Sequence, residues 1–367
     1  MPDMRFAPPN PLRIADRASG LNAVSVRSYN ERLVLSLLLQ SKDITRLEIG
    51  ERTGLSAQTV SVIVRSLEQE GLIAKGEAQR GRVGPPTVPI SLNPEGAYSV
   101  GISIGHQRVE VVLVDFVGSI RFHTMLPMPA HSHDSNHPQF MRSIEAAIRI
   151  LPADLHGRIA GIGLALPEDK AELELAPKGA QERFEALQDE IEKEIGYPVY
   201  VQNDITAAAG GESMFGMAKS LSDYLFFYLG ARLHSRLILN HQIYNAHAAV
   251  SFDVGILRLE REVRKAGTLT AQLWERGSVW PGHGAVETAW REELVAQMKK
   301  SVEALAQFVP VPTVVLSSYA PRSLCQAICS DLESSLPGVH AVAGNIERSP
   351  KAVGAASLPF SSRFMVR

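Results

Sequence analysis

The pattern of hydrophobic and polar positions over residues 28–92 predicts three short helices followed by a basic segment rich in Gly and Pro. In the third expected helix, apolar residues recur every three or four positions, which indicates a face packed on the first two helices. These residues are Val60, Ile63, Val64 and Leu67. Gly54 precedes this helix, where a tight turn favours a positive φ. The order is typical of a winged helix-turn-helix, a module that lays one helix in the DNA major groove.

Polar residues at fixed spacing predict where these helices begin. Ser28 with Glu31, and Thr45 with Glu48, match a capping box, in which each side chain accepts a hydrogen bond from a backbone N–H of the other residue. Ser56 is expected to cap the third helix. The first two helices are therefore predicted to begin at Ser28 and Thr45.

A second face of the third helix carries small and amide side chains and one arginine, which suit base edges and phosphates. The candidate DNA-contacting residues of this helix are Ser56, Ala57, Gln58, Thr59, Ser61 and Arg65. Arg80 and Arg82 in the wing are further candidates, because flexible arginines beside a helix-turn-helix can enter a minor groove. The alternative is a helical bundle that binds protein, and the two wing arginines argue against it.

After Asn93-Pro94 the pattern changes from helical to alternating. A meander of three strands is expected first, then helices alternating with strands, then a second meander with its own helices and strand. Strands are expected over 98–105, 109–118, 119–128, 158–167, 197–204, 223–230, 236–240, 242–244 and 313–318, and helices over 138–150, 180–195 and 205–216. Two α/β units that each begin with a meander predict a duplicated fold with a cleft between two lobes.

Composition describes an ordinary globular protein, with 45% hydrophobic and 21% charged residues among 367. Residues 1–92 contain 12 Lys or Arg and 9 Asp or Glu, whereas the remainder contains 25 and 30. A mildly basic head on an acidic body fits a DNA-binding domain joined to a body that does not bind DNA. Only two cysteines, no apolar run of membrane-spanning length and no signal-peptide core predict a cytoplasmic protein without a membrane partner.

The body resembles the ROK family (repressors, open reading frames and sugar kinases). The resemblance covers about residues 28–358, and it is carried by segments 81–105, 111–118, 161–167 and 197–212 and by Gly354-Ala355-Ala356. It implies a two-lobed α/β body of the ribonuclease-H-like, actin-like fold behind the winged helix-turn-helix. The expected division is a flexible arm at 1–27, the winged helix-turn-helix at 28–92, lobe I at 93–209 joined by 340–367, and lobe II at 210–339 with oligomerisation and a candidate effector cleft.

The resemblance also implies which positions would hold the nucleotide in a kinase of the family. At each of these positions the chain has a residue that differs from the family's. Ser103 stands in place of an Asp, and Gly105-His106-Gln107 in place of a Gly-Gly-Thr turn. The segment 230–234 replaces a second Gly-rich loop, and Ser317-Ser318 replaces a glycine pair. Phosphoryl transfer needs phosphates cradled by closely approaching backbone N–H groups. We therefore expect no kinase activity and no cofactor.

The sugar-binding positions of the family are partly kept. Asn203-Asp204 match the pair that contacts sugar hydroxyls, although Asp204 can instead be a cap of the following helix. Asp253 aligns with the Glu of a Glu-x-Gly-His motif whose His is missing, and Lys178 lies in the altered sugar-facing loop. These four residues are the candidate effector-binding residues. The cysteine-rich zinc motif of the family is absent, so we expect no structural metal.

These observations predict a sequence-specific DNA-binding transcription regulator of the ROK type, by analogy a repressor, without kinase activity. A homodimer or dimer of dimers would read a pseudo-palindromic operator in double-stranded DNA, under the control of a sugar or sugar-like effector. Two alternatives stay open. One is a sugar kinase with a DNA-binding head, and the other is a regulator independent of any effector, whose body is only a dimerisation platform.

Overall fold

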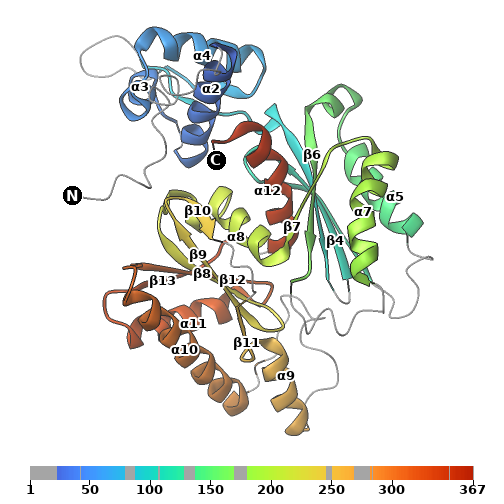
Figure 1. Ribbon diagram of the computed structural model, residues 1–367, viewed down its shortest axis with the longest axis vertical. Coiled ribbons are helices and arrows are strands. Elements are labelled where there is room, and N and C mark those ends of the chain that lie inside the picture. The colour runs from blue at the N-terminus through green and yellow to red at the C-terminus, as the bar shows by residue number, and fades with distance from the viewer. Residues whose placement is uncertain are drawn as a thin grey trace. The chain divides into compact units, whose positions relative to one another are not determined.

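The computed structural model describes residues 23–41, 43–78, 87–105, 108–127, 137–168, 180–244, 250–267, 282, 284–346 and 348–366. The chain forms two compact units (Figure 1). One comprises residues 1–96 together with 361–367, and the other comprises residues 97–360. The expected N-terminal arm and the wing arginines Arg80 and Arg82 lie outside the described residues.

The first unit has the predicted order of helices followed by a small antiparallel ribbon. Its elements are α2 (Ala23–Gln40), α3 (Arg46–Thr53), α4 (Ala57–Gln69), β1 (Ile73–Lys75) and β2 (Ile90–Leu92). The four apolar residues predicted to form the inner face of α4 are at most 3% exposed. From the C-terminal segment, the Val366 N–H donates to Ser36 Oγ on α2 at 3.0 Å. The winged helix-turn-helix fold of this segment is confirmed.

Two of the predicted helix starts are correct and one is wrong. The Thr45 N–H donates to Glu48 Oε2 at 2.7 Å and the Glu48 N–H donates to Thr45 Oγ1 at 3.3 Å. The bonds from the Thr45 N–H and hydroxyl to Glu48 Oε2 lower the pKa of the Glu48 carboxyl. Ser56 caps α4, and Gly54 ends α3 at a φ of 70°. The first helix, however, begins at Ala23, so Ser28 lies inside it. Residues three apart share a helix face, so the same spacing also occurs within helices.

The second unit begins with a five-stranded sheet in the order β5-β4-β3-β6-β7. Its strands are β3 (Tyr98–Ile104), β4 (Arg108–Asp115), β5 (Ile120–Pro127), β6 (Ile159–Leu166) and β7 (Val199–Asn203). The first three form the predicted antiparallel meander, and β6 and β7 add in parallel. The helices α5 (His137–Arg149) and α7 (Ala180–Ile195) pack together on one side of this sheet (Figure 1).

A second sheet repeats this connectivity. It has the order β10-β9-β8-β12-β13, with β11 paired to β9. Its strands are β8 (Tyr224–Leu229), β9 (Leu233–Leu239), β10 (Gln242–Tyr244), β11 (Ser251–Phe252), β12 (Thr313–Ser318) and β13 (His340–Ala343). An antiparallel meander is again followed by parallel strands, and the accompanying helices are α9 (Ile256–Lys265), α10 (Gly284–Ala306) and α11 (Arg322–Ser335). The predicted duplicated α/β body is confirmed, whereas β11 and β13 were not predicted.

Two helices of the second unit pack through small residues. They are α8 (Asp204–Met214) and α12 (Pro350–Phe364), which the reader can follow near β7 in Figure 1. A Cβ added at Gly163 of β6 would lie 1.8 Å from the Ala355 carbonyl oxygen of α12. A Cβ added at Gly354 would lie 2.0 Å from the Ala207 carbonyl oxygen of α8. Glycine is therefore required where the backbone of α12 meets the sheet and α8.

None of the described helices combines the length and apolar character that a bilayer crossing requires. Within the described ranges, no three His, Cys, Asp or Glu side chains are grouped as a metal site would need.

Candidate nucleic-acid interface and ligand site

The face of α4 that lies opposite the domain core carries most of the predicted DNA-contacting residues. Ala57, Gln58 and Arg65 are exposed, and Ser61 is partly exposed. The opposite face is held in the core by the four buried apolar residues of α4. The fold therefore gathers an amide, a hydroxyl and a guanidinium on one surface of a capped helix. Such groups can donate to phosphates and to base edges.

Ser56 and Thr59 have a local structural role at the start of α4. The Thr59 N–H donates to Ser56 Oγ at 3.2 Å, and the two hydroxyl oxygens lie 2.9 Å apart. The cap satisfies a backbone donor that has no partner within the helix and fixes the direction in which α4 begins. Any contact of these two hydroxyls with DNA stays a prediction.

The sequence analysis missed one exposed residue on this surface. Val62 is 53% exposed, and it was neither among the four apolar residues assigned to the core nor among the predicted DNA-contacting residues. It stands four residues after Gln58 and three before Arg65, and this spacing places all three on one helix face. The same spacing was visible in the sequence and could have identified it.

The predicted ligand residues Asn203 and Asp204 lie together where β7 joins α8. Asn203 caps α8, because its Oδ1 accepts the Thr206 N–H at 2.7 Å. Asp204, only 1% exposed, is the first residue of the helix and not its cap. Its Oδ1 accepts the Glu168 N–H at 3.1 Å. Lys351 of α12 forms an ion pair with its Oδ2, without hydrogen-bond geometry.

Four charged side chains from different elements form a cluster at this point, which we call the charge cluster: Glu168, Asp204, Arg236 and Lys351. Arg236 of β9 is 6% exposed and forms an ion pair with Glu168, which follows β6. It also donates from Nε to Thr206 Oγ1 at 2.9 Å and from Nη2 to Asn203 Oδ1 at 3.2 Å. Two positive and two negative charges balance, so the buried Asp204 and the partly buried Glu168 each have a cation beside them.

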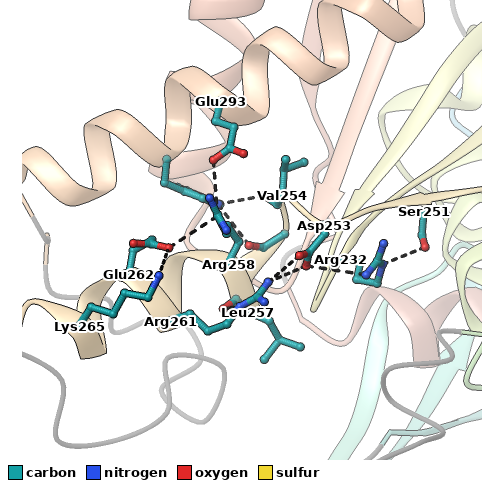
Figure 2. A network of polar contacts seen from close by, with 12 residues as sticks. Arg232, Ser251, Asp253, Val254, Leu257, Arg258, Arg261, Glu262, Lys265 and Glu293 are labelled. Atoms are coloured by element: carbon teal, nitrogen blue, oxygen red, sulfur yellow. Dashed lines mark hydrogen bonds and ion pairs between the residues drawn. The ribbon is translucent and has the colours of Figure 1, made fainter.

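Asp253 lies in a separate network before α9, drawn in Figure 2. Arg261 Nη2 donates to both of its carboxylate oxygens, at 2.7 and 2.8 Å, and Arg232 Nη1 lies 3.7 Å away. Arg232 also donates to Ser251 Oγ at 3.0 Å. The contacts of Asp253 thus differ from those of the charge cluster. Lys178, the fourth predicted ligand residue, lies outside the described residues.

The serines that replace the family's glycine pair are engaged inside the body. Ser317 Oγ donates to Glu212 Oε1 at 3.2 Å, and Ser318 Oγ donates to the Leu229 carbonyl oxygen at 2.6 Å. Both serines are at most 7% exposed. Burial raises the pKa of the Glu212 carboxyl, although hydrogen bonds from Met217, Ile346 and Ser317 act in the opposite direction. These hydroxyls serve internal hydrogen bonds.

A buried carboxylate lies directly across the sheet from Ser103. Glu110 of β4 pairs with Ser103 of β3, so both side chains emerge on the same face. Arg108 Nε lies 2.7 Å from the Glu110 carboxylate and His123 Nε2 lies 3.9 Å from it. Burial alone would raise the pKa of Glu110, but interactions with His123, Arg108 and Ser349 outweigh burial and lower it. The sequence analysis did not identify this group.

Comparison with known proteins separates the chain into the same two parts. Residues 27–74 match the model of a winged helix-turn-helix DNA-binding family, and residues 99–267 match the model of the ROK family.

Two curated relatives are repressors. A xylose repressor of Bacillus spizizenii is 27% identical over 261 residues, which cover 68% of this chain and 65% of the relative. An N-acetylglucosamine repressor of Escherichia coli O6:H1 is 22% identical over 243 residues, which cover 65% of this chain and 59% of the relative. The chain therefore spans less than two thirds of the length of these relatives.

A solved structure supports the fold. It is a ROK family transcriptional regulator, a homologue of the Escherichia coli MLC protein, with a TM-score of 0.63 at 16% identity. The match covers 92% of this chain and 98% of that structure. At this identity the likeness shows the fold, a helix-turn-helix followed by the two-lobed body.

Proposed function

We propose that the chain, which matches a winged helix-turn-helix model over residues 27–74 and the ROK model over residues 99–267, is a sequence-specific DNA-binding transcription regulator of the ROK type. The observation that carries this proposal is the exposed face of α4. This face leaves Gln58 and Arg65 available while the other side of the helix is fully packed. Both relatives are repressors, which supports repression as the sign of regulation.

Each exposed group of α4 has a role that follows from its chemistry. Gln58 can form two hydrogen bonds with adenine, and Arg65 can pair with guanine or with a phosphate. Ser56, Ala57, Thr59 and Ser61 lie near the helix N-terminus, where the helix dipole and hydroxyl groups favour a phosphate. Arg80 and Arg82 are proposed to reach a minor groove beside this site.

A comparison of two glutamines in the same helix tests this assignment. Gln58→Ala should remove one adenine contact, worth about 1–3 kcal/mol, and relax base preference at one position of each half-site. Gln69, the exposed last residue of α4, provides the matched control, and Gln69→Ala should leave base preference unchanged. The measurement is sequence selection from random duplexes by each variant. Equal base preferences for Gln58→Ala and the unmodified chain would show that the recognition face is misplaced.

We further propose that the body lacks kinase activity. Asp204, which belongs to the pair that contacts sugar hydroxyls in the family, is almost fully buried and paired with Lys351. Its carboxylate is therefore already engaged inside the protein, whereas phosphoryl transfer needs a base within reach of the sugar hydroxyl. Ser317 and Ser318 add buried side chains where the family has bare glycine, and Ser103 supplies no carboxylate for a metal. Incubation with ATP, Mg²⁺ and xylose, glucose or N-acetylglucosamine should yield no sugar phosphate.

We propose that regulation arises because the binding of an effector and the binding of DNA are thermodynamically coupled. A sugar or sugar-derived effector that binds one arrangement of the lobes better would shift the pairing of two DNA-reading heads in a homodimer or dimer of dimers. Asn203, Asp204, Asp253 and Lys178 are the proposed effector contacts, and the protein is proposed to act in the cytoplasm. One observation favours the platform alternative, because Asn203 and Asp204 already have protein partners.

Thermal unfolding in the presence of sugars separates these two accounts. A specific effector at a hundred times its dissociation constant should add about 2.7 kcal/mol to the free energy of unfolding. Asp204→Asn should abolish the shift caused by that effector. If no sugar or sugar phosphate raises the melting temperature, the body is only a dimerisation platform.

A further inference from the structure

The exposed face of α4 includes an apolar side chain, Val62, between polar neighbours. Its exposed fraction is 53%, whereas the apolar residues on the inner face of the helix are at most 3% exposed. Gln58 lies one helical turn before it, and Arg65 lies three residues after it. Since residues three and four apart are neighbours on a helix surface, the three side chains form one continuous strip.

Packing and helix propensity do not account for a valine at this position. The inner face of α4 already fills the space against α2 and α3, and Val62 lies outside it. Valine is also a weaker helix former than alanine, lysine or glutamate, because its branched side chain restricts χ1. Isolated exposed apolar residues are common, and Leu47 of α3 is 72% exposed. Val62 differs because it stands within the strip that carries Gln58 and Arg65.

We propose that Val62 contacts the C5 methyl group of a thymine in the major groove, and thereby specifies an A·T pair at one position of each half-site. This inference rests on the proposed DNA-binding function, and it names a second base that α4 recognises. The thymine methyl is the apolar group on the major-groove edges of the bases, and apolar side chains recognise it by contact. A cytosine at the same position would present its N4–H donors to a side chain that cannot accept them.

The helix geometry places this thymine near the base pair that Gln58 reads. Four residues of helix span about 6 Å, and successive base pairs are about 3.4 Å apart. Val62 should therefore read one or two base pairs away from Gln58. The preferred half-site is expected to contain the adenine recognised by Gln58 and the thymine recognised by Val62 at this short spacing.

Replacement of single thymines by uracil tests the proposal directly, because this change removes the methyl group and keeps every hydrogen-bonding group. The full-length chain is first used to select its preferred duplex, and each thymine is then replaced in turn. Fluorescence anisotropy should show binding weakened about fourfold at one thymine of each half-site, as expected for the loss of about one buried methyl group. This scan uses the unmodified chain and does not depend on the stability of a variant.

Variants then identify the side chain responsible. Val62→Ala should bind the thymine and uracil duplexes equally, whereas Leu47→Ala should keep the fourfold difference. Circular dichroism checks that both variants stay folded. The inference is overturned if no thymine is sensitive to the exchange, or if Val62→Ala retains the difference. A preferred duplex without a sensitive thymine overturns this inference alone, whereas the absence of any preferred duplex overturns the proposed function as well.

Discussion

The Asp204 carboxylate is buried and paired, and so it is not a solvated group that is free to bind a ligand. It is 1% exposed, and its charge is balanced by Lys351 and by a backbone N–H. Lys351 in turn lies 5.1 Å from the centroid of the Tyr228 ring, which provides a second favourable contact for its ammonium group. A ligand at this site must therefore compete with contacts that the protein already makes.

A double-mutant cycle measures this pairing. Lys351→Met should lower the free energy of unfolding by about 3 kcal/mol, because it leaves the Asp204 charge buried without a cation. The combined change Lys351→Met with Asp204→Asn should recover most of that loss, since no unpaired charge remains. Urea unfolding of the four proteins gives the coupling free energy. Additive losses would show that the two residues do not interact energetically.

Glu110 predicts a dependence of stability on pH. Its pKa in the folded chain lies below the ordinary value of 4.5, so its contribution to stability is complete above that pH and is lost as the pH falls through the folded-state pKa. The melting temperature of Glu110→Gln should therefore fall below that of the unmodified chain at pH 7, and the difference should shrink below about pH 4.5.

Glu292 of α10 offers a control for this measurement because its side chain is exposed. Glu292→Gln should change the melting temperature little at either pH. A difference for Glu110→Gln that is constant from pH 7 to pH 4 would contradict the assignment.

Sequence reasoning identified single residues where a local pattern was sufficient, and missed their distant partners. Ser56 and Gln58 follow from helix capping and periodicity, and Asn203-Asp204 from a family motif. The partner of Asp204 is 147 positions away along the chain, at Lys351, and Arg236 reaches Glu168 across 68 positions. Such pairs depend on how strands and helices assemble, which single-residue patterns do not encode.

At the scale of elements, close backbone packing of α12 determines the architecture of the second unit. Gly101 and Gly163 on neighbouring strands, with Gly211 on α8, leave room for the helix backbone. The Gly354-Ala355-Ala356 segment meets them with small side chains. This explains physically why the family-like segment near the end of the chain consists of small residues, a feature that the sequence analysis used only as a resemblance.

Gly163→Ala tests this packing. The new Cβ would lie 1.8 Å from the Ala355 carbonyl oxygen, so β6 and α12 must move apart. We expect a loss at or above the upper end of the usual range of about 1–3 kcal/mol for overpacking, seen as a lower urea midpoint. Gly157 precedes the same strand and has open space around it, so Gly157→Ala should change stability by less than about 0.5 kcal/mol. Equal effects of the two changes would contradict the packing described here.

Most elements were predictable because their patterns are long and regular. The alternating and apolar runs of β3, β4 and β8 and the amphipathic α7 agree with expectation within a few residues. The two strands that were missed are short. β11 has two residues and β13 has four, and both are defined by pairing with β9 and β12 rather than by their own composition. The early start of α2 at Ala23 was missed for a related reason, since a local capping pattern was preferred to the extended helix.

The whole molecule combines a winged helix-turn-helix unit with a two-lobed α/β body. The first unit carries on α4 a strip in which polar and apolar groups alternate, and in the second unit the charge cluster links residues that follow or belong to both sheets. The predicted fold class is confirmed at this scale. The bounds of the two lobes, the oligomeric state and the effector stay predictions.

If the exposed face of α4 binds a defined DNA sequence, the full-length chain should select that sequence from a random pool of duplexes. We expect enrichment of a pseudo-palindromic site whose half-sites contain an adenine and a thymine one or two base pairs apart. Recovery of duplexes without a common sequence, together with ATP-dependent phosphorylation of a sugar by the same preparation, would contradict it.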